Sequence, residues 1–429
     1  MSNKPSQNSF QQYDVVIVGG GAGGQAVAAS LHKRDSSLSL AIIEPTDEHY
    51  YQPGWTMVGG GIFNAGQTKR CMADVMHKKA TWIKSSVNSF RPEKNEVITK
   101  DNDVIAYQAL IIAPGLKLDW GAIEGLEETL GKNGVTSNYR YDLAPYTWEL
   151  VQDLKKGKAL FTQPPMPIKC AGAPQKALYL SCDHWLKKGK LSDIDVHFHN
   201  AGPVLFGVAD YVPALEKYIE KYNADVHFNE NLIKVDGPNK KATFRVSDGE
   251  GKAKDVEVDF DMLHVCPPQT AHDFIKNSPL SNEAGWLNVN QETLQHVDYG
   301  NIFGLGDIIS APNAKTAAAV RKQAPVVAHN VVSYLMGGQS AAIYEGYGSC
   351  PLTVERGKIV LAEFGYGGTL QPTLPTSMLN GLKPTKRAWF LKEKLLPWMY
   401  FDLMLKGHEL LAKPKTLAQT PMLHETSSR

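Results

Sequence analysis

Two of the five cysteines stand where a thiol could do chemistry. Cys170 ends the strand-like run LFTQPPMPIKC, and Pro174 follows it in a position that suits the first turn of a helix. A thiol at a helix N-terminus, beside Lys169 and Lys176, is expected as a thiolate because positive charge lowers a cysteine pKa. Cys350 lies in the glycine-rich run EGYGSCPL, which predicts a loop. Reactive groups concentrate on loops that a rigid scaffold positions.

The other three cysteines are interpreted as small buried hydrophobic residues. Cys182 lies in the helical pattern ALYLSCDHWLKK, Cys266 continues the apolar run MLHVC, and Cys71 falls in a predicted helix. No CxxC is present, so neither a zinc ribbon nor a thioredoxin-type motif is expected. We expect no metal among the site residues.

A dinucleotide site is predicted near the N-terminus. The run DVVIVGGGAGG is a β-branched strand that ends in GxGxxG spacing at Gly19, Gly21 and Gly24, and a helical pattern follows. Glycines there permit the tight turn, the close approach of a pyrophosphate and close packing of the helix. Glu44 ends the next apolar run, 20 residues beyond Gly24, where a carboxylate can bind the ribose hydroxyls.

Two further glycine turns favour FAD over NAD as the cofactor. Ala113 and Gly115 end the strand-like run ALIIAPG, and Gly306 and Asp307 end NIFGLGD before a long helical pattern. Asp307 is placed to bind the ribityl hydroxyls of a flavin. Three such signals in this order resemble the flavoproteins with two dinucleotide-binding domains.

In that superfamily a second GxGxxG near mid-chain binds NAD(P)H. The corresponding run here is VHFHNAGPVLFGV, in which Gly202 and Gly207 are the only glycines of the turn and Pro203 and Phe206 stand between them. We therefore expect a second Rossmann-like unit that has lost its nicotinamide site, and an electron donor other than NAD(P)H.

Composition excludes several classes of protein. Lys and Arg number 45 against 44 Asp and Glu, so there is no basic surplus for nucleic acid. The 43% hydrophobic and 21% charged residues are typical of a folded globular protein. The polar start MSNKPSQNSFQQ predicts no secretory signal, and no apolar run is long enough to span a bilayer.

Several long segments together resemble the sulfide:quinone oxidoreductases, in particular the two-cysteine branch that includes the mitochondrial enzymes. They are HYYQPGWTMVGGG, PIKCAGAPQKALYLS, AGPVLFGVADYVPALEKY, KTAAAVRKQAPVV and YGSCPLT. The resemblance implies FAD, Cys170 and Cys350 as the redox pair, sulfide as donor, a membrane quinone as acceptor and an unidentified acceptor of sulfane sulfur. Many bacterial members use a third cysteine after the Ala-Pro-Gly turn, and residues 116–141 contain none.

The chemistry of a cysteine pair is consistent with that resemblance. Sulfide that loses two electrons leaves as sulfane sulfur, which one cysteine can carry as a persulfide. Thiol–disulfide exchange, by which sulfur would pass between such cysteines, needs an attacking thiolate and an accessible sulfur. The sequence leaves open which cysteine accepts sulfide and which reacts with the flavin.

The C-terminal region has the composition of a membrane-surface segment. Five of the 13 residues from Trp389 to Phe401 are aromatic, and Pro397 is expected to divide the region into two helices. Lysine and arginine outnumber acidic residues by six to two over 383–406. Amphipathic helices of this kind lie in the interface rather than span it. The alternative is a helix pair docked on the core.

Six more residues are candidates for the cofactor and quinone sites. Lys315 could stabilise negative charge on a reduced flavin, and Gln52 is expected to approach the flavin. The family uses backbone groups near Val87 against adenine. Three aromatic residues are expected to line the quinone site: Phe364, Phe390 and Tyr400.

The predicted fold is α/β, with two Rossmann-like domains and C-terminal amphipathic, membrane-facing helices. The predicted segments are a polar tail (1–12), a discontinuous FAD domain (13–115 and 295–340), a second Rossmann-like domain (116–294), a flavin-capping segment with the second redox cysteine (341–381) and a membrane-associating region (382–429). The expected location is peripheral, at the cytoplasmic face of a bacterial inner membrane.

Two alternative functions remain open. They are an NADH:quinone oxidoreductase-like flavoenzyme and a non-catalytic flavin-binding sensor at the membrane. The altered mid-chain turn and the cysteine pair disfavour the first, and the cysteine contexts alone disfavour the second. The sequence also leaves open a homo-oligomer.

Overall fold

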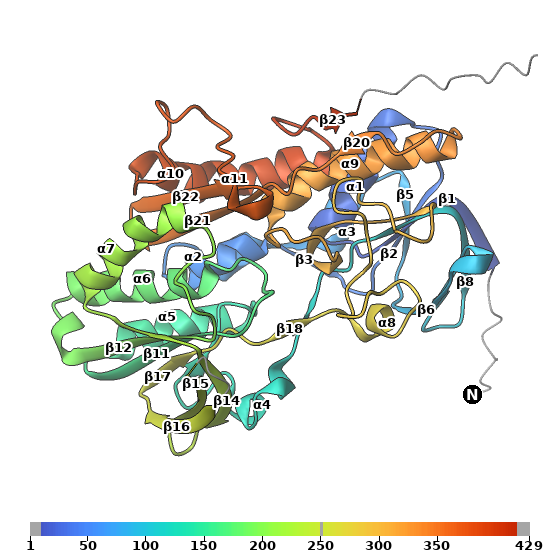
Figure 1. Cartoon of the computed structure of the whole chain (residues 1–429). Coiled ribbons are helices and arrows are strands. Elements are labelled where there is room, and N and C mark those ends of the chain that lie inside the picture. Colours follow the sequence, from blue (N-terminus) through green and yellow to red (C-terminus); the bar gives the residue numbers. More distant parts are fainter. Residues whose placement is uncertain (1–9, 249–251, 418–429) are drawn as a thin grey trace, which may run out of the picture.

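The computed structural model describes residues 10–248 and 252–417. Its first sheet has the strand order β5-β2-β1-β8-β7-β6, with β19 beside β8 (Figure 1). The strands are β1 (Phe10–Val18), β2 (Leu40–Ile43), β5 (Ala80–Ile83), β6 (Val87–Arg91), β7 (Glu96–Thr99), β8 (Val104–Ile112) and β19 (Ile302–Gly304). β1, β2, β5, β8 and β19 are parallel to one another, and the apolar runs of β1, β2, β8 and β19 are buried. Helices α1 (Ala22–Arg34) and α9 (Ala317–Leu335) pack against each other beside this sheet.

A second parallel sheet has the order β10-β17-β11-β12-β13. Its strands are β10 (Val135–Thr136), β17 (Met262–His264), β11 (Gly157–Gln163), β12 (Ile194–Asn200) and β13 (Asp225–Phe228). Helices α5 (Leu143–Asp153), α6 (Ala173–Lys187) and α7 (Val212–Tyr222) share a core with one face of this sheet. The meander β14 (Glu230–Asp236), β15 (Lys241–Ser247) and β16 (Ala253–Asp259) covers the other face (Figure 1). The predicted α/β fold with two Rossmann-like units is confirmed.

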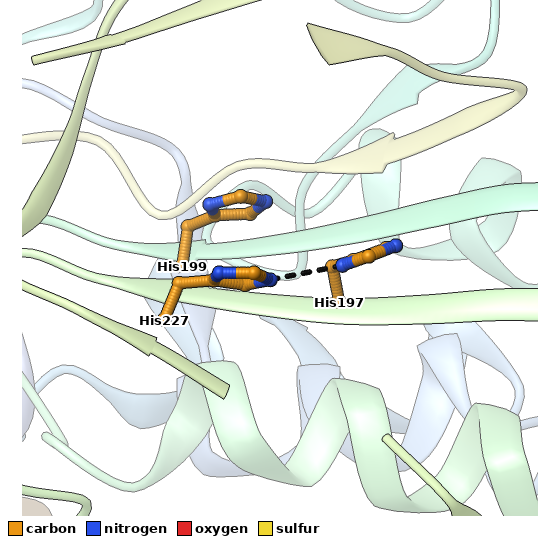
Figure 2. Close-up of side chains that lie close together, drawn as sticks. All are labelled: His197, His199 and His227. Atoms are coloured by element: carbon orange, nitrogen blue, oxygen red, sulfur yellow. Dashed lines mark hydrogen bonds between the residues drawn. The ribbon is translucent and has the colours of Figure 1, made fainter. Parts of the chain in front are cut away.

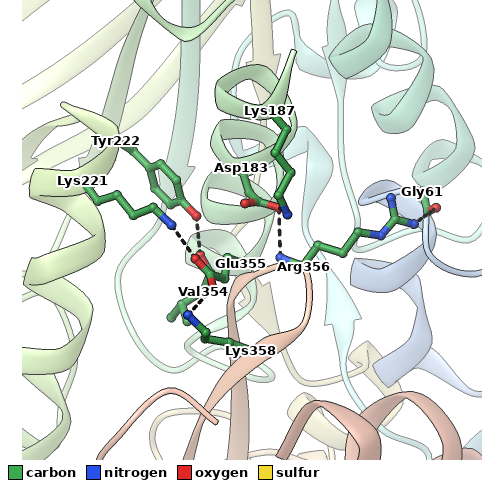
Figure 3. Close-up of polar contacts among 9 residues, drawn as sticks. All are labelled: Gly61, Asp183, Lys187, Lys221, Tyr222, Val354, Glu355, Arg356 and Lys358. Atoms are coloured by element: carbon green, nitrogen blue, oxygen red, sulfur yellow. Dashed lines mark hydrogen bonds and ion pairs between the residues drawn. The ribbon is translucent and has the colours of Figure 1, made fainter. Parts of the chain in front are cut away.

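A hairpin of β21 (Gly348–Glu355) and β22 (Lys358–Phe364) joins the second unit to the C-terminal helices. Its turn is held by polar contacts, as Figure 3 shows. The Arg356 backbone N–H donates to the Asp183 carboxylate of α6 at 3.0 Å, and Glu355 pairs with Lys358 at 2.8 Å and with Lys221 of α7. These contacts fix the hairpin against α6, the helix that follows Cys170.

Short elements complete the described chain. They are β3 (Glu48–Tyr50), α2 (Trp55–Gly59), β4 (Lys69–Cys71), α3 (Met72–Val75), β9 (Lys117–Leu118), α4 (Leu126–Thr129), β18 (Gln269–Thr270), α8 (Asp273–Lys276), β20 (Ala342–Ile343) and β23 (Lys415–Thr416).

Two predicted segment boundaries differ from the structure. β1 begins at Phe10 and pairs with β8 from that residue, so positions 10–12 are strand rather than polar tail. The chain also returns to the first core well before residue 295, because Ala271, Ile275, Leu280 and Leu287 are all buried in that core. Apolar residues in short loops and turns gave no periodic signal for this earlier return.

The C-terminal region is one continuous helical run rather than two helices. It passes through α10 (Lys386–Phe390), the π-helical turn η9 (Leu391–Leu395), α11 (Leu396–Trp398), a second π-helical turn η10 (Met399–Leu403) and the 3-10 turn η11 (Met404–Lys406). The predicted break at Pro397 is wrong. π-Turns lie on both sides of the proline and accommodate its missing N–H within the helix.

Within residues 10–248 and 252–417, no helix combines the length and apolar character needed to cross a membrane. The final part of the predicted membrane-associating region, 418–429, lies outside the described residues.

Candidate active site

A cavity of about 670 Å³ lies at the carboxyl ends of the first sheet, between that sheet, α6, the β21–β22 hairpin and the C-terminal helical run. Its size is in the range of cofactor and ligand sites. Most of the predicted site residues line it: Gly19, Gly21, Glu44, Gln52, Ala113, Gly115, Cys170, Gly306, Asp307, Lys315 and Tyr400. Residues that are far apart in sequence are therefore brought to one place.

The glycine turn after β1 has the geometry of a phosphate-binding turn. Gly19 has φ +98°, and a Cβ on it would lie 2.5 Å from the Ala113 carbonyl oxygen. A Cβ on Gly24 would lie 1.8 Å from the Gly19 oxygen, so Gly24 is needed for packing although it does not line the cavity. A Cβ on Gly21 would meet nothing within 4 Å, which leaves room for a phosphate at the start of α1.

The Glu44 carboxylate is fixed at the edge of this turn. Its Oε2 accepts the Gly20 backbone N–H at 2.7 Å, and its Oε1 accepts the Thr46 backbone N–H at 2.9 Å and the Thr46 hydroxyl at 2.6 Å. Oε1 already accepts two hydrogen bonds, but Oε2 has one lone pair left and can accept a hydrogen bond from a hydroxyl of an adenosine ribose.

Asp307 and Lys315 form the far wall of the cavity. Lys315 Nζ donates to the carbonyl oxygens of Asp307 at 2.7 Å and Ile309 at 3.0 Å, and it lies 4.3 Å from the centre of the Trp286 ring. Burial lowers the pKa of Lys315 to about 8, although Asp307 opposes the shift. Burial raises the pKa of Asp307. One N–H of Lys315 remains for a ligand.

These residues fit FAD. The turn at Gly21 is open to a pyrophosphate, Glu44 is placed for a ribose, and a carboxylate and an ammonium stand at the other end of the same cavity. The N-terminal cap of α1 also has no side-chain hydrogen bond, so its N–H groups are available to phosphate.

The structure brings the two predicted redox cysteines together. Cys170 Sγ lies 3.5 Å from Cys350 Sγ, and Lys176 Nζ lies 3.0 Å from Cys170 Sγ. Cys170 has φ +50°, an unusual conformation for a residue with a side chain, and its N–H donates to the Lys315 carbonyl oxygen at 3.0 Å.

Cys350 is on a strand rather than in the predicted loop. It is the third residue of β21, pairs with Ala362 of β22 and is buried. It does not line the cavity itself but lies beneath Cys170, between the lining residues Ser349 and Pro351. The glycines at 346 and 348 obscured the start of the strand.

The surroundings favour a thiolate on Cys170 and a thiol on Cys350. The hydrogen bond from Cys350 lowers the pKa of Cys170 well below its usual range, burial opposes the shift, and the Lys176 ammonium lowers it further. The same hydrogen bond and burial raise the pKa of Cys350. Lys176 is itself buried, and its contacts with the two cysteines raise its pKa despite that burial.

The sequence analysis missed a buried lysine from the C-terminal run. Lys392 was counted in the basic surface, yet only 3% of it is exposed, and its Nζ lies 3.4 Å from the Pro53 carbonyl oxygen. Burial, together with the charge of nearby Lys176, lowers the pKa of Lys392 to about 7. Lys392, Leu396, Met399 and Tyr400 all line the cavity. Their helical spacing was the signal that could have identified this inner face.

The three aromatic residues assigned to the quinone site are not brought together. Tyr400 lines the cavity, and its hydroxyl is hydrogen-bonded to His49 Nε2 at 2.8 Å. Phe364 packs edge-on against Phe206, with ring centres 6.0 Å apart, and Phe390 is 56% exposed. Neither Phe364 nor Phe390 lines the cavity.

Of the remaining predicted positions, Gln52 lines the cavity and the others lie away from it. Val87 is the first residue of β6 and is buried in the first core. Cys182 and Cys266 are buried, as expected. Cys71 is exposed at the end of β4, so the prediction that it is buried in a helix is wrong. Gln52 lines the cavity and accepts a hydrogen bond from Lys169 Nζ at 2.6 Å.

The mid-chain turn after β12 directs three of its side chains into the core, while Pro203 is exposed. Leu205, Phe206 and Val208 are buried in the core of the second unit. The next helix, α7, begins only at Val212. This arrangement supports the expected loss of a nicotinamide site.

Replacing Lys176 with methionine is expected to slow sulfide-dependent flavin reduction at pH 7 and to move the pH profile upward. Loss of the ammonium raises the pKa of Cys170, so less thiolate is present at neutral pH and more returns as the pH increases. The measurement is the rate of Cys170 alkylation and of flavin reduction against pH. An unchanged pH profile in a folded variant would show that Lys176 does not hold the thiolate.

Comparisons with known proteins agree with this geometry. The family model of the pyridine nucleotide-disulphide oxidoreductases matches residues 13–147. The chain is 44% identical over 397 residues to the mitochondrial sulfide:quinone oxidoreductase of Dictyostelium discoideum, covering 92% of this chain and 86% of that protein. It is 37% identical to the mitochondrial enzyme of Mus musculus, covering 92% and 87%.

A solved structure shares the fold. The sulfide:quinone oxidoreductase of the hyperthermophilic bacterium Aquifex aeolicus superposes with a TM-score of 0.75 at 21% identity, covering 91% of this chain and 92% of that chain. With relatives of 44% and 37% identity along nearly the whole chain, the protein belongs to the sulfide:quinone oxidoreductase family.

Proposed function

We propose that this protein oxidises sulfide to sulfane sulfur through Cys170, Cys350 and FAD, and passes two electrons to a membrane quinone. The observation that carries the proposal is the 3.5 Å approach of Cys170 Sγ to Cys350 Sγ beside the cavity that fits FAD. Bound FAD supplies a two-electron acceptor that the quinone can reoxidise. Two thiols at this separation can form and break a disulfide with a small side-chain movement.

The asymmetry of the pair favours one order of events. In the oxidised pair, hydrosulfide attacks one sulfur, the S–S bond breaks and the electron pair leaves on the other sulfur. The better leaving group is the thiol with the lower pKa, which is Cys170 beside Lys176. We therefore assign the persulfide to Cys350 and the released thiolate to Cys170. An external nucleophile, which can be a second hydrosulfide, then takes the sulfane sulfur and leaves Cys350 as a thiolate. Two electrons pass to the cofactor as the two thiolates form the disulfide again.

The C-terminal helical run has the side chains expected of a surface that contacts the bilayer, where a quinone substrate is dissolved. Its inner face lines the cavity, while Leu395 and Trp398 lie on its outer face and are 37% and 50% exposed. Lys386, Arg387 and Lys394 are exposed beside them. Apolar and basic groups on one surface favour an anionic membrane interface. We propose peripheral binding there, at the cytoplasmic face of a bacterial inner membrane, with the quinone entering beneath this run.

When sulfide is added to the purified protein under anaerobic conditions, the flavin absorbance is expected to fall within the stopped-flow time range. When NADH is added instead, no such fall is expected. The sulfide reaction uses Cys170 at the flavin cavity, whereas the second nucleotide turn lacks the full glycine pattern and carries the buried Leu205 and Phe206. The measurement is flavin absorbance after each donor is added separately. Rapid bleaching by NADH with none by sulfide would favour the NADH:quinone oxidoreductase alternative, and no bleaching by either would favour the sensor.

A further inference from the structure

We propose that His197, His199 and His227 form a binding site for a divalent transition-metal cation such as Zn²⁺. His197 and His199 stand two apart on β12 and so point to the same face of the sheet. His227 on β13 lies directly opposite His199 in the strand register. Figure 2 shows the three rings gathered at one place. None of the three lines the redox cavity.

The nitrogen atoms of the three imidazoles are separated by distances close to those needed for binding one metal ion. Each ring contributes one nitrogen to a group of three in which all the nitrogens lie within 4.8 Å of one another. Two ring nitrogens, His197 Nδ1 and His227 Nε2, are 2.9 Å apart. A tetrahedral ion bound at about 2.1 Å separates its ligand nitrogens by roughly 3.4 Å. The rings of His199 and His227 are stacked, 10° from parallel (Figure 2), so binding requires the imidazoles to turn until their lone pairs meet.

Carboxylates lie beside the outer nitrogens of the rings, and Glu230 is hydrogen-bonded to one of them. Glu230 Oε2 lies 2.7 Å from His199 Nδ1, and its Oε1 lies 3.8 Å from His227 Nδ1. Asp195 Oδ2 lies 2.9 Å from His197 Nε2. In histidine metal sites a carboxylate commonly accepts the N–H of one ring nitrogen and leaves the other as the ligand. The hydrogen bond to Glu230 leaves His199 Nε2 as a ligand, and the carboxylate contacts of the other two rings favour His227 Nε2 and His197 Nδ1.

A buried nitrogen without a partner points independently to a ligand. The side chain of His199 is 3% exposed and its ring stacks on Phe244 of β15, with ring centres 3.9 Å apart. Among the described residues, His199 Nε2 has no hydrogen-bond partner. Several buried atoms of the described residues lack a partner, but His199 Nε2 does so inside a histidine cluster, where it is available to a ligand.

The charges around the cluster favour a cation. Asp195, Asp225 and Glu230 surround the rings, and Lys158, 3.4 Å from Asp195, offsets only part of their charge. Asp225 Oδ2 lies 4.0 Å from His197 Nδ1 and is a candidate fourth ligand. Imidazole ligands with a carboxylate suit Zn²⁺ and its neighbours better than Mg²⁺ or Ca²⁺. A bound ion would link β12 to β13 and stabilise the second unit.

The test uses the full-length, FAD-loaded protein after treatment with a chelator and dialysis. Titration with ZnCl₂ in a calorimeter is expected to show one ion bound per chain with micromolar or tighter affinity. The unfolding temperature should rise with Zn²⁺, because a ligand that binds the native state stabilises it. Absence of binding up to 100 μM Zn²⁺ at about pH 7.5 would overturn the proposal.

Two variants locate the ion. His227→Gln and His197→Gln each remove one proposed ligand, and His227 is 33% exposed, so its replacement should be tolerated by the fold. Each is expected to weaken Zn²⁺ binding by at least about 100-fold and to abolish the rise in unfolding temperature. His408→Gln, which changes an exposed histidine outside the cluster, is the matched control and should bind as the wild type does.

Flavin content and the rate of sulfide-dependent flavin reduction should stay unchanged in both variants, because the cluster is separate from the cavity. If one variant fails to retain FAD, the other decides the result. Wild-type affinity in a folded variant of either residue would place the ion elsewhere and refute the site.

Discussion

Replacing either Cys170 or Cys350 with serine is expected to lower sulfide-dependent quinone reduction by at least about a thousandfold, while FAD remains bound. The two sulfurs act as a unit, since neither can form the disulfide without the other 3.5 Å away. A serine hydroxyl can accept neither sulfane sulfur nor an S–S bond. FAD should stay bound because its phosphate turn and Glu44 are on other elements.

The measurement combines steady-state quinone reduction, stopped-flow flavin reduction and flavin content. Cys182→Ser is the control matched in burial, because Cys182 is as buried as Cys350 but lies in a helix core away from the cavity. It should reduce stability and leave turnover per bound flavin intact. Cys71→Ser should change neither, since Cys71 is exposed. Turnover within tenfold of wild type in Cys170→Ser or Cys350→Ser would exclude the pair as the redox centre.

Local sequence was sufficient for the nucleotide turns. A strand, a glycine turn and a helix adjoin in sequence at Gly19–Gly24, so the geometry at Gly19 and Gly24 follows from a contiguous segment. Asp307 and Lys315 likewise follow β19 in one short segment and reach the same cavity. Parallel strands deliver their carboxyl ends to one edge, which explains why distant turns could be expected to meet.

Features that depend on pairing between distant strands could not be predicted in the same way. Cys350 is on a strand because β21 pairs with β22, yet the glycines before it are typical of a loop. The histidine cluster forms because His227 is placed opposite His199 by the register of two parallel strands. Such registers are set by tertiary packing, and no local pattern in the sequence specifies them.

The C-terminal run shows why composition alone assigned Lys392 to the wrong face. A surplus of lysine predicts a solvated surface, and Lys386 and Lys394 do lie there. Lys392 differs because it faces the same side of the helical run as the cavity-lining Leu396 and Tyr400. Helical position, rather than residue type, decides which lysine is buried.

Substituting both Phe390 and Trp398 with glutamate is expected to release the protein from vesicles and to stop quinone reduction there, without slowing flavin reduction by sulfide. The two side chains are 56% and 50% exposed on the outer face of the C-terminal run. Burial of each large side chain is worth about 1.5–3 kcal/mol, so loss of two should weaken membrane binding by at least about 100-fold. The added negative charges also oppose binding to anionic lipid.

Point substitutions test this surface better than removal of the run. Tyr400, Met404 and Leu405 pack in the first core, and Lys392 lines the cavity, so a truncated chain would lose part of its fold and active site. Phe390 and Trp398 lie outside that core and do not line the cavity. Their replacement should therefore leave the redox centre intact.

The matched control substitutes Phe10 and Val297 with glutamate. These side chains are 66% and 53% exposed, comparable to the tested pair, and Phe10 begins β1, far from α10 and α11 in Figure 1. Co-sedimentation with vesicles that contain anionic lipid and a quinone measures binding, and stopped-flow absorbance measures flavin reduction. If Phe390/Trp398→Glu sediments as fully as the control, the outer face of the C-terminal run is not the membrane-binding surface. If it is released but also loses sulfide-dependent flavin reduction, then the run supports the sulfur chemistry as well, and its two faces are not separate in function.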